Sequence, residues 1–141
     1  MAQVSLGLGS NLGDRRKHLT DAVEKINNRI GSVLSQSDFI RSKPQGFKSK
    51  NYFLNAVVIV ETSLSPTELL QETKKIETEL GRTHKTISSP TGKVYSDRVI
   101  DIDILLYDDL FIDTEELTIP HPLMQERDFV MVPLEQAKKR M

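Results

Sequence analysis

The sequence of 141 residues contains no cysteine. This absence excludes disulfides, thiolate nucleophiles and cysteine-ligated zinc or iron–sulfur sites, and it fits a reducing compartment. No apolar run approaches the ~20 residues that a membrane span needs, and no basic segment followed by an apolar stretch opens the sequence. We therefore expect a cytoplasmic protein without a membrane partner.

The chain also has no excess of charge of either sign, since its 19 basic residues nearly balance its 20 acidic residues. The net charge gives no reason to expect nucleic acid as a partner. With 38% apolar residues, a chain of this length can bury one core. We expect a single domain over residues 1–141, and a monomer.

Apolar periodicity and turn residues predict an alternation of strands and helices. Strands are predicted at 3–8, 32–42, 52–62 and 99–107, with a turn at Asp108 and Asp109 after the last one, and helices are predicted at 15–30 and 66–80. The order β-α-β-β-α-β is that of the ferredoxin-like plait, an α+β fold in which two helices cover one face of an antiparallel sheet. Residues 117–139 predict short extended and helical pieces as a C-terminal extension that covers the other face, which would give three α/β/α layers.

The most informative stretch is the last predicted strand, which carries Asp101 and Asp103 between isoleucines. Residues two apart on a strand share a face, so the carboxylates should lie roughly 6–7 Å apart. An ordinary strand with one solvated face would explain the alternation equally well. Two close carboxylates repel each other, however, and Mg²⁺ relieves this when it binds one or two of them together with phosphate oxygens.

Cationic residues flank this strand. Arg98 precedes it, Arg82 follows the second helix, and the loop between them holds His84, Lys85 and Lys93. Phosphoryl transfer needs cations around the transferred group, so the combination favours this chemistry. The alternative for the loop residues is a solvated surface.

Two familiar phosphate-binding signatures are absent from the first turn. "GLGSNLG" has Leu12 at the third glycine position of the dinucleotide fingerprint, and it lacks the Gly-Lys-Ser/Thr of a P-loop. We interpret Ser10, Asn11 and Asp14 as turn and capping residues.

Phe53 and Asn55 lie two apart at the start of the strongest strand, so a ring and an amide share one face. Such a pair can hold a planar heterocycle with polar edges, and Phe129 could supply a second ring. The alternative for the amide is a hydrogen bond to backbone. His121, which lies between two prolines, and Arg127 are candidate hydrogen-bond donors to phosphate.

Five segments in order, "LGSNLGD", "YFLNAVV..ET.LSP..LL", "E..LGR", "DR.IDIDILLY" and "L.IPHP.M..RDFV..PL", resemble the 6-hydroxymethyl-7,8-dihydropterin pyrophosphokinase family of folate biosynthesis. The similarity covers essentially the whole chain. It implies an enzyme that transfers the β,γ-pyrophosphoryl group of ATP to the hydroxymethyl group of the dihydropterin, giving the pterin diphosphate and AMP. Two Mg²⁺ ions would act with ATP.

The resemblance also implies roles for individual residues. Asp101 and Asp103 would be catalytic Mg²⁺ ligands, and Arg82 and Arg98 would hold the pyrophosphoryl group. The rest of the implied ATP site is Lys74, Glu77, Lys85, His121 and Arg127, with Ile104, Leu117 and Thr118 lining the adenine. The implied pterin site is Phe53 and Phe129 as stacking rings, Asn55 at the polar edge, and Ser42, Lys43, Gln45 and Asp101. The segments 42–51 and 82–97 would be loops that close over the substrates.

Some positions depart from the family pattern. The second loop has no tryptophan, which some relatives place over the pterin, and Tyr95 is the available substitute. Lys74 replaces a common amide, His84 a common basic residue, Lys43 a frequent proline, and Pro122 a tyrosine of some relatives. Two alternatives stay open: a plait-type sensor without catalysis, and a pyrophosphokinase for another heterocyclic alcohol. An RNA-binding module is disfavoured because its aromatic strand motif is missing.

Overall fold

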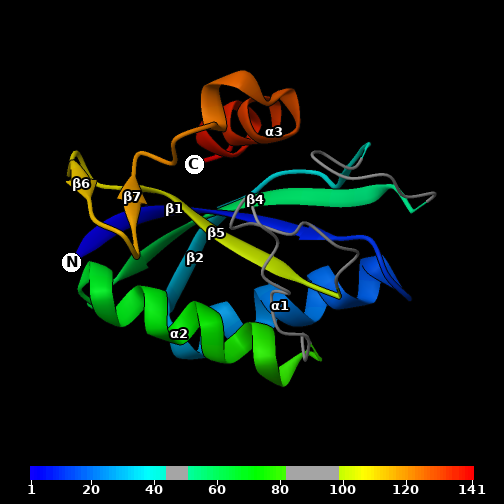
Figure 1. Ribbon diagram of the computed structural model, residues 1–141, viewed down its shortest axis with the longest axis horizontal. Helices are drawn as coiled ribbons and strands as arrows, with labels where there is room; N and C mark the ends of the chain where they lie inside the picture. The colour runs from blue at the N-terminus through cyan, green and yellow to red at the C-terminus, as the bar shows by residue number, and fades with distance from the viewer. Residues whose placement is uncertain (44–50, 82–98) are drawn as a thin grey trace.

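The computed structural model describes residues 1–43, 51–81 and 99–141 (Figure 1). The elements in order are β1 (Ala2–Ser10), α1 (Arg15–Arg29), β2 (Gly31–Gln36), β3 (Ile40–Ser42), β4 (Phe53–Thr62), α2 (Pro66–Glu79), β5 (Asp101–Tyr107), β6 (Ile112–Asp113), β7 (Thr118–Ile119), a 3₁₀ turn (Met124–Glu126) and α3 (Asp128–Lys139). The predicted segments at 44–50 and 82–98, including most of both proposed closing loops, lie outside the described residues.

The main sheet has the strand order β2-β4-β1-β5, all neighbours being antiparallel, and β3 also pairs with β4. This is the order of a ferredoxin-like plait in which β2 and β3 share the role of one strand. The predicted α+β fold class is therefore confirmed.

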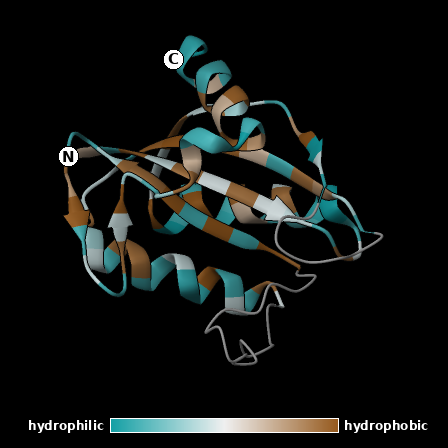
Figure 2. Ribbon diagram, turned by 45° about the horizontal axis from the view of Figure 1, so that its top comes forward, coloured by the Kyte–Doolittle hydropathy of each residue, from teal (hydrophilic) through white to brown (hydrophobic). Residues whose placement is uncertain are grey.

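Helices cover both faces of the sheet, as Figure 1 shows, with α1 and α2 on one side and α3 on the other. Between the sheet and α1 and α2 lies a core that includes Leu6, Ile26, Ile76 and Ile102. A second apolar cluster, which includes Val57, Leu105 and Leu134, joins the sheet to α3. In Figure 2 the strands carry most of the hydrophobic colour, whereas α2 alternates between hydrophobic and hydrophilic residues. The predicted three layers are confirmed.

The helix ends follow the capping signals in the sequence. Ser65 and Glu68 form a capping box at the start of α2, with Ser65 N donating to Glu68 Oε1 at 2.9 Å and Glu68 N to Ser65 Oγ at 3.2 Å. At α1 the carboxylate of Asp14 accepts from Lys17 N at 3.1 Å. These side chains satisfy amides that the first helical turn leaves without a backbone partner.

The single strand predicted at 32–42 is wrong, because β2 ends at Gln36 and β3 begins at Ile40. The regular pairing ends at Ser37: its amide still donates to Val57 O at 2.9 Å, but Val57 N donates to the Ser37 hydroxyl at 2.9 Å in place of a backbone carbonyl. Asp38 N then donates to Gln136 Oε1 of α3 at 2.6 Å. Side chains thus replace the backbone ladder at the break, which explains the incomplete alternation in this part of the sequence.

The last predicted strand is confirmed as β5, Asp101–Tyr107, and the turn predicted at Asp108 and Asp109 follows it, with Asp108 at φ 47°. The C-terminal extension is confirmed, with α3 as its main element. Among the helices of the described ranges, none combines the length and the apolar character needed to cross a bilayer.

Candidate active site

A row of three residues crosses the middle of the sheet. In the pairing of β1 with its two neighbours, Gly9 lies opposite Asn55 of β4 on one side and opposite Asp101 of β5 on the other. Strand alternation then places Phe53 and Asn55 on the face of Val57, and Asp101 and Asp103 on the face of Leu105. Val57 and Leu105 both pack in the cluster beneath α3. The predicted ring, amide and carboxylates therefore share the α3 side of the sheet.

The amide of Asn55 is buried, with 5% of its surface exposed. Its Nδ2 donates to Ser42 Oγ at 2.7 Å and to Ile40 O at 3.3 Å. A β-carbon placed on Gly9 would lie 3.2 Å from Asn55 Oδ1, so the amide oxygen leans over β1. The backbone hydrogen bond considered as the alternative therefore exists, but it takes the nitrogen and leaves the oxygen directed toward the row.

Phe53 lies beside this amide. Ser42 pairs with Phe53 across β3 and β4, and the Phe53 ring carbon Cδ1 would lie 3.4 Å from a β-carbon on Gly9. Of the predicted pterin residues, the structure thus brings Ser42, Phe53 and Asn55 together. Phe129 packs against the apolar cluster beneath α3, on the same side of the sheet.

Asp101 and Asp103 are half-buried and alternate with Ile102 and Ile104, which lie in the core on the opposite face. The central strand has only glycines, Gly9 and Gly7, opposite the two carboxylates. The donor set fits Mg²⁺, because this ion takes one or two carboxylates and completes its shell with phosphate oxygens and water.

The outer edge of β5 is held by α2. Glu77 Oε2 accepts from Ile102 N at 2.7 Å, which shows that this amide points away from β1. Because backbone groups two residues apart on a strand point the same way, the amide of Ile104 faces the same edge. The Ile104 side chain is 4% exposed in the core, so only its backbone could contact an adenine. Lys74 lies one helical turn before Glu77.

The C-terminal extension returns to β5. Leu105 O accepts from His121 N at 3.0 Å, directly after the cis Ile119–Pro120 bond. His121 Nδ1 in turn accepts from Leu123 N at 3.4 Å, which assigns the ring proton of a neutral histidine to Nε2. This proton is a suitable donor to an anion.

The other residues of this extension that were predicted to bind ATP lie at separate places in the structure. Arg127 lies 5.6 Å from the centroid of the Phe129 ring, as measured from its guanidinium carbon. Thr118 is half-exposed in β7, and Leu117 packs partly against the core beside α1 and α2. Gln45, Arg82, Lys85 and Arg98 lie outside the described residues, and Lys43 is the last residue before the first gap.

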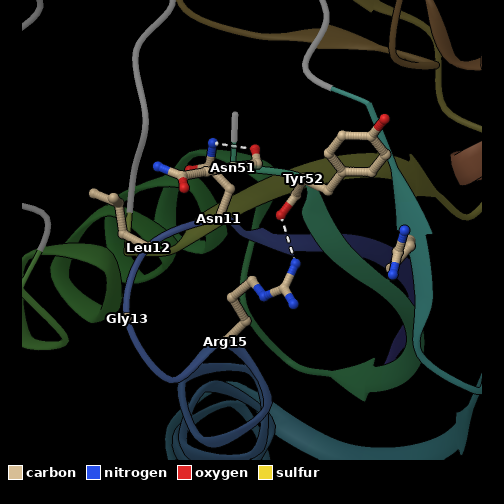
Figure 3. A pocket seen from close by; sticks show the side chains of 7 residues that line it. Asn11, Leu12, Gly13, Arg15, Asn51 and Tyr52 are labelled. Carbon is tan, nitrogen blue, oxygen red and sulfur yellow. Dashed lines mark hydrogen bonds between the residues drawn. The ribbon is translucent and has the colours of Figure 1, made fainter. Parts of the chain in front are cut away.

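A surface pocket of about 420 Å³ lies between the β1–α1 turn and the start of β4 (Figure 3). Asn11 Nδ2 donates to Asn51 O at 3.1 Å, and the Arg15 guanidinium donates to Tyr52 O at 2.7 Å. The two acceptors belong to the two residues before Phe53. Asn11 and Arg15 therefore anchor the backbone that presents the ring, a role that the sequence interpretation of a capping turn did not include.

Residues 5–139 match the family model described as 7,8-dihydro-6-hydroxymethylpterin-pyrophosphokinase, HPPK. The chain belongs to this family. It is 49% identical over 135 residues to the 2-amino-4-hydroxy-6-hydroxymethyldihydropteridine pyrophosphokinase of Porphyromonas gingivalis, covering 95% of this chain and 89% of the relative. The predicted assignment to this family is therefore confirmed, and so is its activity, that of a pyrophosphokinase.

Longer relatives contain the same unit. The folic acid synthesis protein fol1 of Pneumocystis carinii is 45% identical over 131 residues, which are 93% of this chain but 17% of that protein. Among solved structures, the wild-type Plasmodium falciparum HPPK-DHPS with pteroate superposes with a TM-score of 0.72 at 14% identity. That likeness covers 96% of this chain and 40% of the Plasmodium chain, and it supports the fold. This pyrophosphokinase thus serves folate biosynthesis, as the sequence predicted.

Proposed function

We propose that this HPPK transfers the β,γ-pyrophosphoryl group of ATP to the hydroxymethyl oxygen of 6-hydroxymethyl-7,8-dihydropterin and releases AMP. The observation that carries the proposal is the row of Asn55, Gly9 and Asp101 on three adjacent strands. Adjacent strands are about 4.8 Å apart, so the amide and the carboxylate belong to positions roughly 10 Å apart. A ring held at Asn55 would direct its hydroxymethyl arm toward the carboxylates.

The acceptor part of the site is assigned to β3 and β4. In this proposal Phe53 and Phe129 stack on the pterin, and Asn55 reads its polar edge with the oxygen that leans over β1. Ser42 positions the amide through the 2.7 Å hydrogen bond. Lys43, Gln45 and Asp101 are assigned to the same part from the family resemblance.

The metal part of the site is assigned to β5, where Asp101 and Asp103 would hold two Mg²⁺ ions together with ATP. When bound, Mg²⁺ neutralises phosphate charge and so favours attack by an oxygen nucleophile. The carboxylates are suited to this because β5 fixes their spacing and Glu77 fixes the edge of the strand.

The nucleotide part of the site is assigned to the outer edge of β5 and the C-terminal extension. The backbone of Ile104 would meet the adenine, with Leu117, Thr118, Lys74 and Glu77 nearby. His121 would donate its Nε2 proton to a phosphate oxygen, and Arg127 would add positive charge. Arg82, Lys85 and Arg98 are assigned to the phosphates from the family resemblance alone.

The reaction is an in-line displacement at the β-phosphorus. The hydroxymethyl oxygen forms a bond to this phosphorus while the bond to the oxygen bridging the α- and β-phosphates breaks, and that oxygen leaves with AMP. The hydroxyl proton is lost in the process, and we assign Asp103 to assist its departure. Positioning the two substrates and balancing the phosphate charge supply most of the acceleration.

The test is to incubate the protein with ATP, Mg²⁺ and 6-hydroxymethyl-7,8-dihydropterin and to separate the nucleotides. AMP should form in proportion to the acceptor added. ADP as the product, or AMP without acceptor, would refute the proposal. Binding of both ligands without turnover would favour a sensor. The single domain, the monomeric state and the cytoplasmic location stay predictions from the sequence.

A further inference from the structure

Two glycines occupy alternate positions of the central strand, Gly7 and Gly9. Glycine weakens a strand interior because it adds chain entropy and packs no side chain. In the described part of the chain the positive-φ glycines are Gly13 and Gly81, so neither strand glycine is required by its backbone conformation. The remaining reason for glycine is the space that a side chain would take, and different groups occupy that space at the two positions.

The space above Gly7 is filled by the core. A β-carbon there would lie 3.4 Å from both Leu105 methyl carbons, which is ordinary van der Waals contact. Leu105 is itself 1% exposed in the cluster beneath α3. An alanine at position 7 would therefore meet a deformable aliphatic side chain.

The space above Gly9 is filled by groups assigned to the pterin. A β-carbon there would lie 3.2 Å from Asn55 Oδ1 and 3.4 Å and 3.8 Å from two ring carbons of Phe53. The contact with Oδ1 is tighter than most real β-carbon contacts, so the amide would have to give way. It has little freedom to do so, because Ser42 and Ile40 hold its nitrogen at 2.7 Å and 3.3 Å.

We propose that Gly9 is a specificity-determining residue for the acceptor. Because position 9 has no side chain, the Asn55 amide and the Phe53 ring can lie close to β1, and the planar acceptor can extend across β1 toward Asp101. The proposal rests on the assignment of Phe53 and Asn55 to the pterin. A methyl group at position 9 would either rotate the Asn55 amide or occupy space that the acceptor ring needs. Either change lowers affinity for the pterin, whereas the nucleotide edge of β5 is untouched.

The experiment compares Gly9→Ala with Gly7→Ala, a matched control on the same strand and face. For Gly9→Ala we expect the KM for the pterin to rise at least tenfold and the KM for ATP to stay within twofold. The melting temperature should stay close to that of Gly7→Ala, since the advantage of alanine over glycine in a strand interior offsets the tight contact with the amide. For Gly7→Ala both KM values should stay within threefold.

Direct binding separates this role from a general structural one. Titration calorimetry is done with the pterin and, separately, with a non-hydrolysable ATP analogue and Mg²⁺. It should show that Gly9→Ala weakens binding of the pterin and leaves binding of the ATP analogue unchanged. Equal weakening of both ligands, a pterin KM within twofold of wild type, or a melting temperature clearly below that of Gly7→Ala would overturn the proposal. Failure of the wild-type protein to form AMP would instead refute the proposed function.

Discussion

The hydrogen bond from Asn55 to Ser42 offers a quantitative test of how the acceptor site is positioned. Replacing Ser42 by alanine removes the 2.7 Å acceptor and leaves only the 3.3 Å contact with Ile40 O. Asn55 is 5% exposed, so water cannot fully replace the lost partner. A hydrogen bond of this kind contributes about 1 kcal/mol net.

We therefore expect Ser42→Ala to lower the free energy of unfolding by about 1 kcal/mol. The freed amide should raise the KM for the pterin roughly fivefold, since 1.4 kcal/mol corresponds to a factor of ten. Turnover at saturating substrates should change little. The assay is AMP formation at saturating ATP with the pterin varied, together with urea unfolding.

Two further variants make this test specific. Ser32→Ala, at an exposed position of β2, is the control for loss of a serine hydroxyl and should behave as wild type. In an Asn55→Ala background, Ser42→Ala should have less than half of its effect on the pterin, because the partner is already gone. A full effect in that background, or no effect in either, would refute the reasoning.

Three other changes have expected outcomes. Asp101→Asn and Asp103→Asn should each lower turnover by orders of magnitude with an unchanged melting temperature; near-full activity at limiting Mg²⁺ would remove that residue from the metal site. Arg15→Met should raise the pterin KM a few-fold and spare that for ATP, because the start of β4 loses its anchor; an equal rise for both substrates would contradict this. The hydrogen bond from Arg29 lowers the pKa of Glu79 below 4.5. The Arg29–Glu79 pair therefore stabilises the fold above pH 4.5, and this stabilisation is lost as the pH falls through the lowered pKa. Glu79→Gln should lose less stability than wild type between about pH 6 and about pH 3 in urea titrations, and parallel curves would exclude the pair as a source of acid sensitivity.

Much of the fold follows from local signals in the sequence. The capping box at Ser65 and the apolar stripes define α2 and α1, and the β-branched runs define β4 and β5, so the order of elements predicts the plait. The break between β2 and β3 was missed because it depends on tertiary partners: Ser37 bonds to β4, and Asp38 bonds to Gln136 of α3.

The candidate site was predictable in composition and less so in geometry. Alternation on β5 and β4 paired the two carboxylates and joined Phe53 to Asn55. That both pairs flank Gly9 depends on register between distant strands, which no local pattern reveals. Two glycines spaced by one residue inside an apolar strand were the available signal, since such a strand gives up packing only for a close approach. Ile104 has its side chain in the core, so the contact with adenine that the family resemblance implies is assigned to its backbone.

The row across β4, β1 and β5 also links binding to the stability of the whole sheet. Residues 9 and 101 are neighbours in space but belong to the first and last strands of the main sheet, so the row forms only when β5 has docked. A substrate that contacts both sides acts as a non-covalent cross-link between these parts of the chain. Its binding energy adds to the unfolding free energy as ligand concentration exceeds the dissociation constant. Acceptor and nucleotide should therefore protect the whole edge strand against local opening, including the positions of β5 that they do not touch.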